Sequence, residues 1–180
     1  MDFKLANNMS KNITLILASQ SKSRQFVLNK LKIPYEIMPA NIDETQKDNE
    51  SVQDLVKRLS YEKALKIANI LPKNKDKKYL IIGSDQVLCI DKDKVLGKPL
   101  NHKNAISHLR ASSGKLIDCY TGMCMLQIDA DNISHKTTIT NDKIKFKELS
   151  DDIIERYLLK EKPYQCAGAV QYEGLGIALF

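Results

Sequence analysis

LIIGSDQVLCI, residues 80–90, is an apolar segment of high β-propensity with a carboxylate in its middle. Together with Tyr79 it predicts a strand in a buried sheet. Asp85 interrupts the apolar side chains, and an unpaired carboxylate is costly to bury. We therefore expect Asp85 to meet a cation, a set of hydrogen-bond donors or water in a cleft. The alternative is that the strand ends there and Asp85 caps a turn.

The segments on both sides of this strand alternate between strand and helix patterns. After it, the turn Asp91–Asp93 starts a hairpin that returns through Val95 and Leu96. Because a hairpin occurs beside strand–helix alternation, we expect an α/β fold with a mixed sheet flanked by helices. The other predicted strands are 13–18, 33–38, 116–128, 133–147 and the end of 166–180, and the predicted helices are 22–32, 51–70, 101–113 and one from Ser150.

The length of 180 residues and the absence of repeats or a Pro/Gly/Ser-rich linker predict one domain. We assign it to residues 13–180. Residues 1–12 lack the apolar stretch of a signal peptide, so we interpret them as an N-terminal extension. No apolar run approaches the ~20 residues that cross a bilayer, which excludes a membrane-spanning class and favours a cytoplasmic location.

The charged and sulfur-containing residues exclude several further classes. The four cysteines form no CxxC pair, so we expect buried free thiols and no zinc site. The net charge of +6 comes mostly from lysines spread along the chain, which does not favour a nucleic-acid partner. A nucleic-acid-binding module stays open as the third alternative, and it predicts salt-sensitive binding to oligonucleotides.

ASQSKSR, residues 18–24, is a polar turn between the first strand and its helix. Free backbone N–H groups and the helix dipole favour an anion at such a place. Arg24 could add a bidentate pair of donors to a phosphate. An ordinary serine cap with a solvated arginine is the alternative.

NIDET, residues 41–45, is an acidic loop after the second predicted strand. Its Asp43 and Glu44 are neighbouring carboxylates, which could hold Mg²⁺ or Mn²⁺. Acidic loops before helices are common, so this motif alone does not decide between metal binding and a solvated turn.

Seven segments of the chain, taken in order, resemble the Maf family of nucleotide pyrophosphatases. They are LILASQSKSR, IPYEIMPANIDET, RLSYEKA, IIGSDQVL, LGKPLNHKNAISHLRASSGK, YTGMCML and CAGAVQYEGLGIALF, and they cover about residues 13–180. The resemblance implies two lobes around a nucleotide cleft, a homodimer, and cleavage between the α- and β-phosphates of a nucleoside triphosphate with a divalent cation.

The resemblance also implies a role for particular residues of this sequence. Asp85 matches the general base that activates the attacking water. Glu44 matches the acidic residue of the metal region. The phosphate-contacting positions of the family are matched by Ser19, Arg24, Lys63 and Lys98.

Three positions bear on the choice of base. Family members acting on dTTP and UTP typically carry Thr and Gln where this chain has Gln86 and Glu173, and both residues resemble the subfamily that prefers 7-methyl-GTP. The 7-methylguanine base is positively charged and offers N1–H and N2–H₂ donors, which a carboxylate can accept. Ser23 stands where that subfamily often has a bulky residue, and Lys22 replaces the family's proline.

Two alternatives to this reaction follow from the resemblance. One is the same reaction on dTTP, UTP or modified pyrimidine nucleotides. The other is a non-catalytic nucleotide-binding regulator of septum formation. Family members usually continue past the position of Phe180 with a further segment and a final helix, so we expect this sequence to lack the usual C-terminal helix.

Overall fold

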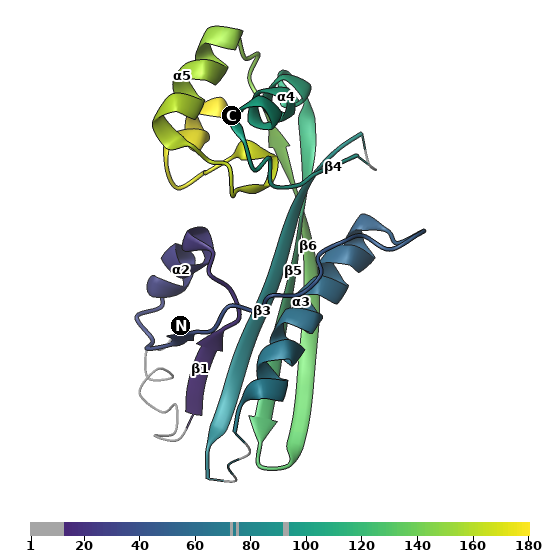
Figure 1. Cartoon of the computed structure of the whole chain (residues 1–180), viewed down its shortest axis with the longest axis vertical. Coiled ribbons are helices and arrows are strands. Elements are labelled where there is room, and N and C mark those ends of the chain that lie inside the picture. Colours follow the sequence, from purple (N-terminus) through teal and green to yellow (C-terminus); the bar gives the residue numbers. More distant parts are fainter. Residues whose placement is uncertain (1–12, 73, 75, 92–93) are drawn as a thin grey trace. The chain divides into compact units, whose positions relative to one another are not determined.

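The computed structural model describes residues 13–72, 74, 76–91 and 94–180. The expected extension 1–12 and residues 92–93 of the expected turn lie outside this range. The elements, in chain order, are β1 (Ile13–Leu17), α2 (Lys22–Asn29), β2 (Glu36–Ile37), α3 (Val52–Ile70), β3 (Lys78–Ile90), β4 (Lys94–Leu96), α4 (His102–Ser112), β5 (Leu116–Asp129), β6 (Asn132–Lys145), α5 (Asp151–Glu161) and the 3₁₀ helices η1 (Ala167–Ala169) and η2 (Leu175–Leu179) (Figure 1).

The strands form one six-stranded mixed sheet. Its order is β2-β1-β3-β5-β6, and β4 pairs with β3 off this path. Strand β1 runs parallel to both β2 and β3, whereas β4 runs antiparallel to β3. The predicted α/β class with a mixed sheet and the hairpin after β3 are therefore confirmed.

The chain divides into two compact units. The first contains the described residues up to Glu50 together with Asp54–Asp85 and Gly122–Ile139, and the second contains Ser51–Gln53, Gln86–Thr121 and Thr140–Phe180. Among the helices of the described ranges, none has the length and apolar character that a bilayer crossing requires.

The core of the first unit lies on both faces of β1 and β3. Side chains alternate between the faces of a strand, so Ile16 and Ile81 pack with Ile67 of α3 on one face. On the other face, Leu15 and Leu17 pack against Leu28 of α2. The near-continuous apolar sequences of β1 and β3 follow from this two-sided burial.

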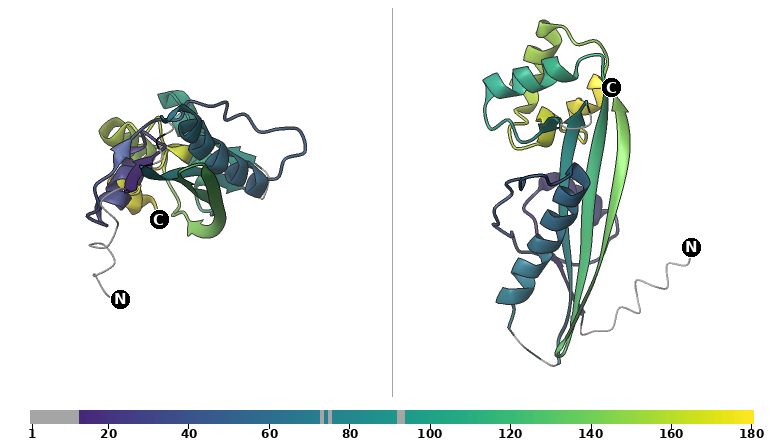
Figure 2. Two further views of the ribbon diagram at one scale, coloured as in Figure 1. Left: turned by 90° about the horizontal axis from the view of Figure 1, so that it is seen from below. Right: turned by 90° about the vertical axis from the view of Figure 1, so that its right-hand side faces the viewer.

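Two glycines allow the backbone of α3 to approach the sheet closely. A Cβ atom on Gly83 of β3 would lie 2.1 Å from the carbonyl oxygen of Ser60, and one on Gly122 of β5 would lie 2.1 Å from that of Val56. Figure 2 shows α3 lying along these strands. Any larger residue at either position would therefore push the helix away from the strands.

The core of the second unit is formed by the end of β3, α4, α5 and the C-terminal segment. Its largest fully buried side chains include Leu109 of α4, Leu158 of α5 and Phe146. The hydroxyl of Tyr157 donates to Ala169 O and accepts from Gln171 N, both at 3.0 Å. This hydrogen bonding ties α5 to the C-terminal segment.

The helix starts agree with the sequence pattern. Ser21, Asn101 and Ser150 each accept a hydrogen bond from a backbone N–H in the first turn of α2, α4 and α5. The long helix up to Ile70 is also confirmed.

Three predicted elements differ from the structure. The strand expected at 33–38 is only Glu36–Ile37, and the helix expected at 22–32 ends at Asn29. The prediction of a strand at the end of the chain is wrong, because Leu175–Leu179 is a 3₁₀ helix. Gly174 and Gly176 both donate backbone hydrogen bonds to Gln171 O. Local turns therefore satisfy the backbone N–H groups of this segment, and pairing with a neighbouring strand is not needed for them.

We predict that Gly83→Ala destabilises the protein by about 1–3 kcal/mol or more, because the added methyl group overlaps the backbone of α3. Gly97→Ala is the matched control, since a Cβ there would have no described atom within 4 Å apart from those of its chain neighbours. Urea unfolding of both variants measures the difference. Equal stabilities for the two variants would show that α3 does not need this close contact.

Candidate active site

A buried ion pair joins α3 to β3. Lys63 Nζ lies 2.6 Å from Asp85 Oδ1, and the two residues are 5% and 7% exposed. Asp85 follows Ile81 and Gly83 at the strand period of two, so it lies on the face of β3 that α3 covers. The cation that a buried carboxylate at this position requires is therefore Lys63.

The same ammonium group binds a second carboxylate. Lys63 Nζ lies 2.7 Å from Glu44 Oε1, and the Glu44 side chain is 42% exposed. One buried lysine thus brings together a carboxylate from a strand and one from a loop. Among the described residues, no group of three or more His, Cys, Asp or Glu side chains could hold a metal ion.

The polar turn before α2 is held by its own side chains. Ser21 Oγ accepts from Arg24 N at 3.5 Å, so the serine cap that the sequence offered as the alternative is present at this helix start. Ser19 Oγ accepts from Arg24 Nη1 at 3.0 Å and from Ser21 N at 3.2 Å. Because Ser19 uses its oxygen in both contacts, its hydroxyl hydrogen can be donated to an anion.

Arg24 lies within electrostatic reach of both carboxylates. Burial lowers the pKa of Arg24, while the negative charges of Asp85 and Glu44 raise it. The first unit thus gathers two cations, Arg24 and Lys63, and two anions, Glu44 and Asp85. This arrangement brings together five residues singled out from the sequence, the fifth being Ser19.

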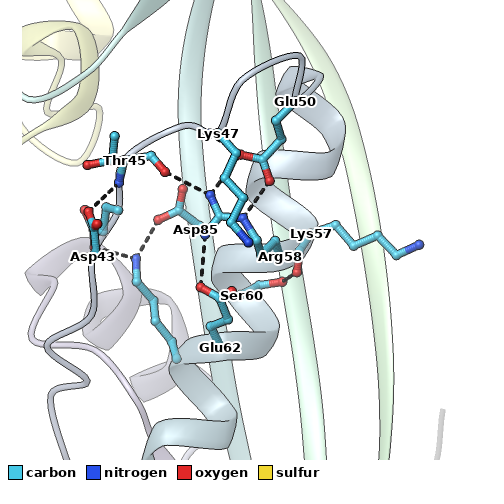
Figure 3. Close-up of polar contacts among 11 residues, drawn as sticks. Asp43, Thr45, Lys47, Glu50, Lys57, Arg58, Ser60, Glu62 and Asp85 are labelled. Atoms are coloured by element: carbon cyan, nitrogen blue, oxygen red, sulfur yellow. Dashed lines mark hydrogen bonds and ion pairs between the residues drawn. The ribbon is translucent and has the colours of Figure 1, made fainter.

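Asp43 forms its hydrogen bond within its own loop. Its carboxylate accepts from Thr45 N at 2.9 Å. Hydrogen bonding from the Thr45 side chain, and then from the Thr45 backbone N–H, lowers the pKa of Asp43. Asp43 therefore shapes the turn that presents Glu44. In Figure 3 it lies in the loop, near Thr45.

Arg58 was not singled out from the sequence, although it stands in the segment RLSYEKA five residues before Lys63. Arg58 hydrogen-bonds Glu50 and the carbonyl oxygen of Thr45 in the loop that carries Glu44 (Figure 3). Arg58 and Lys63 stand in the same segment of one predicted helix. This proximity to a candidate site residue was the sequence signal that could have pointed to Arg58.

The second unit contains three of the other candidate residues, Gln86, Lys98 and Glu173. Gln86 Nε2 donates to Thr121 Oγ1 at 2.9 Å. Lys98 is exposed in the loop after β4. Ser23, in the first unit, is half-buried in α2, and its role in base choice stays a prediction.

Glu173 has an unusual environment in the second unit. Both carboxylate oxygens are buried, and neither makes a hydrogen bond of normal distance and angle to another described residue. Burial raises the pKa of the nearby Cys166 thiol, as does the charge of Glu173, while Lys98 lowers it. Burial raises the pKa of the adjacent Tyr172, and so do the charge of Glu173 and its contact with the tyrosine side chain. A buried carboxylate with so few donors is costly, so Glu173 is a candidate acceptor for donors on a ligand.

A model of the family described as Maf-like protein matches residues 14–180. A Vibrio parahaemolyticus protein named 7-methyl-GTP pyrophosphatase is 41% identical to this chain, and the match covers 94% of this chain and 83% of that protein. Proteins of the same name from Colwellia psychrerythraea and Pseudoalteromonas atlantica are 43% and 45% identical, with 93% and 92% of this chain covered and 80% and 81% of theirs.

We predict that Lys63→Met destabilises the protein by about 3–5 kcal/mol, because Asp85 is then buried without its cation. Lys66→Met, at an exposed position of the same helix, is the control and changes stability by less than about 0.5 kcal/mol. Adding Asp85→Leu to Lys63→Met restores most of the loss. Similar unfolding midpoints for Lys63→Met and Lys66→Met would contradict the buried ion pair.

Proposed function

The chain belongs to the Maf-like protein family, and from this premise we propose that it hydrolyses 7-methyl-GTP to 7-methyl-GMP and diphosphate. The observation that carries the proposed reaction is the buried Lys63, which binds the carboxylates of Asp85 and Glu44. The relatives named 7-methyl-GTP pyrophosphatase support the choice of nucleotide.

In this proposal Asp85 is the general base. Attack on the α-phosphorus needs a positioned water that loses a proton as the new P–O bond forms. Lys63 holds the carboxylate through Oδ1 at 2.6 Å, which fixes its orientation. The other oxygen of such a carboxylate can take the proton from water.

The triphosphate is bound at the start of α2. Ser19 and Arg24 supply a hydroxyl and a guanidinium there, and the N-terminus of the helix favours an anion. Lys63 contributes a further positive charge, and Lys98 is assigned by resemblance to a phosphate oxygen. These groups stabilise the charge that develops on the phosphate oxygens and on the leaving diphosphate.

The residues present fit a divalent cation of the Mg²⁺ or Mn²⁺ type. Such ions bind through one or two carboxylates together with substrate phosphates, and Glu44 and Asp85 converge on one point, the Lys63 ammonium. The two positive and two negative charges of the cluster cancel, so the cluster has no net positive charge to offset a triphosphate. A bound cation would supply that positive charge. A bound ion would polarise the phosphate oxygens and lower the pKa of water.

Glu173 is proposed to recognise the base. Its buried oxygens make no hydrogen bond of normal distance and angle to another described residue, and the cationic 7-methylguanine edge offers two N–H donors of matching polarity. Gln86 and Ser23 are proposed as further specificity residues. The homodimer stays a prediction from the family resemblance, and the cytoplasmic location stays a prediction from the sequence.

The protein is incubated separately with 7-methyl-GTP, GTP, UTP, dTTP and CTP. We predict metal-dependent hydrolysis of 7-methyl-GTP to 7-methyl-GMP and diphosphate, in preference to the other four nucleotides. Product analysis by chromatography is repeated with chelator and with Asp85→Asn, which we expect to lower kcat by at least about 100-fold. Preference for UTP or dTTP would favour the pyrimidine alternative. No turnover by the folded protein would favour the non-catalytic regulator.

We predict that Glu173→Gln lowers kcat/KM for 7-methyl-GTP about 10- to 100-fold, because one acceptor and the negative charge are lost. The value for UTP falls much less, so the ratio of the two constants reports base recognition. Glu36→Gln, at an exposed position of β2, is the control. An equal loss for both nucleotides would assign Glu173 to folding rather than to the base.

A further inference from the structure

The loop between β2 and α3 carries Glu44 but has few apolar contacts of its own. Met38 and Ala40 pack against the core of the first unit, and Ile42 is half-buried. All side chains of residues 43–49 are exposed. Polar contacts must therefore fix the position of Glu44 relative to Lys63.

Arg58 of α3 supplies three of the contacts that join the loop to this helix. Its Nε and Nη2 atoms donate to the two carboxylate oxygens of Glu50 at 2.6 and 2.8 Å, and Nη2 also donates to Thr45 O at 3.0 Å. Nη1 donates to Glu62 of the same helix at 3.0 Å. The guanidinium thus binds both the end of the loop and the residue that follows Glu44.

Glu50 extends this clamp into the loop. Its Oε2 atom accepts from Lys47 N at 3.0 Å, and its backbone carbonyl accepts from Gln46 Nε2 at 2.7 Å. Asp43 accepts from Thr45 N on the other side of Glu44. The residue pair Arg58 and Glu50 therefore holds the loop at one end, while Asp43 shapes its other end.

The pair differs from an ordinary surface ion pair. The side chains of Arg58 and Glu50 are 16% and 9% exposed, whereas Glu62 is 36% exposed. Contact with Arg58 lowers the pKa of Glu50 to about 2, so it is ionised at neutral pH. Bidentate contacts of low exposure carry more energy and geometric specificity than the helical Arg58–Glu62 pair.

We propose that Arg58 and Glu50 are positioning residues that clamp the 43–50 loop to α3 and so hold Glu44 at the Lys63 ammonium. The clamp sets the affinity of the site for a divalent cation, and this part rests on the proposed function. Residues that orient a ligand of a metal typically change its affinity 10- to 100-fold when they are replaced.

The test compares Arg58→Gln, Arg58→Lys and Glu50→Gln with the matched control Glu62→Gln, which removes an Arg58 contact that lies outside the loop. Arg58→Lys keeps the charge but loses the fork of donors. Hydrogen–deuterium exchange of residues 43–50, Mn²⁺ binding by electron paramagnetic resonance, and the metal concentration for half-maximal activity are measured. Thermal unfolding identifies any variant that does not fold.

We expect exchange in the 43–50 loop to accelerate about tenfold or more in the Arg58 and Glu50 variants, and their Mn²⁺ affinity to fall about tenfold. Glu62→Gln leaves both unchanged. Unchanged loop exchange in folded Arg58→Gln or Arg58→Lys overturns the clamp. Faster exchange with wild-type Mn²⁺ affinity, or no Mn²⁺ binding by the wild type, overturns its role at the metal. If the variants lower Mn²⁺ affinity as expected but the wild type turns over no nucleotide, the clamp stands and only the proposed reaction is refuted.

Discussion

The buried contact between Lys63 and Asp85 is the interaction on which the candidate site depends. A charge pair of this kind is stabilising only when both partners are held in good geometry, and it costs several kcal/mol when one is removed. The geometry exists because Gly83 lets the backbone of α3 lie against β3. A constraint of packing thus places a lysine beside the one carboxylate in an apolar strand.

The charges around this contact are balanced, which suits a highly charged substrate. Arg24 and Lys63 oppose Glu44 and Asp85, so the formal charges of the cluster sum to zero. A triphosphate entering it would add negative charge that the helix N-terminus and a divalent cation can offset. Arg58 acts at a distance in this scheme, because it holds the loop that contributes one of the two carboxylates.

The sequence predicted those elements whose signals are local. Strand β3, the hairpin to β4 and the capped helices α2, α4 and α5 follow from propensity, turn residues and serine or asparagine caps. The C-terminal apolar segment was misassigned because period and propensity do not report whether a partner strand exists. The contacts of Arg58 with Thr45 and Glu50 were missed, since they depend on how an irregular loop folds back onto α3. The family resemblance singled out Lys63, and the acidic loop already singled out Glu44, but only the structure shows that they share one ion-pair network.

The position of the new oxygen atom after hydrolysis in ¹⁸O-labelled water tests the proposed mechanism most directly. If Asp85 activates a water that attacks the α-phosphorus, mass spectrometry finds one ¹⁸O atom in 7-methyl-GMP and none in the diphosphate. Label in the diphosphate, or release of orthophosphate, would place the attack at another phosphorus. Either result would contradict the account in which Asp85, held by Lys63, activates water for attack at the α-phosphorus.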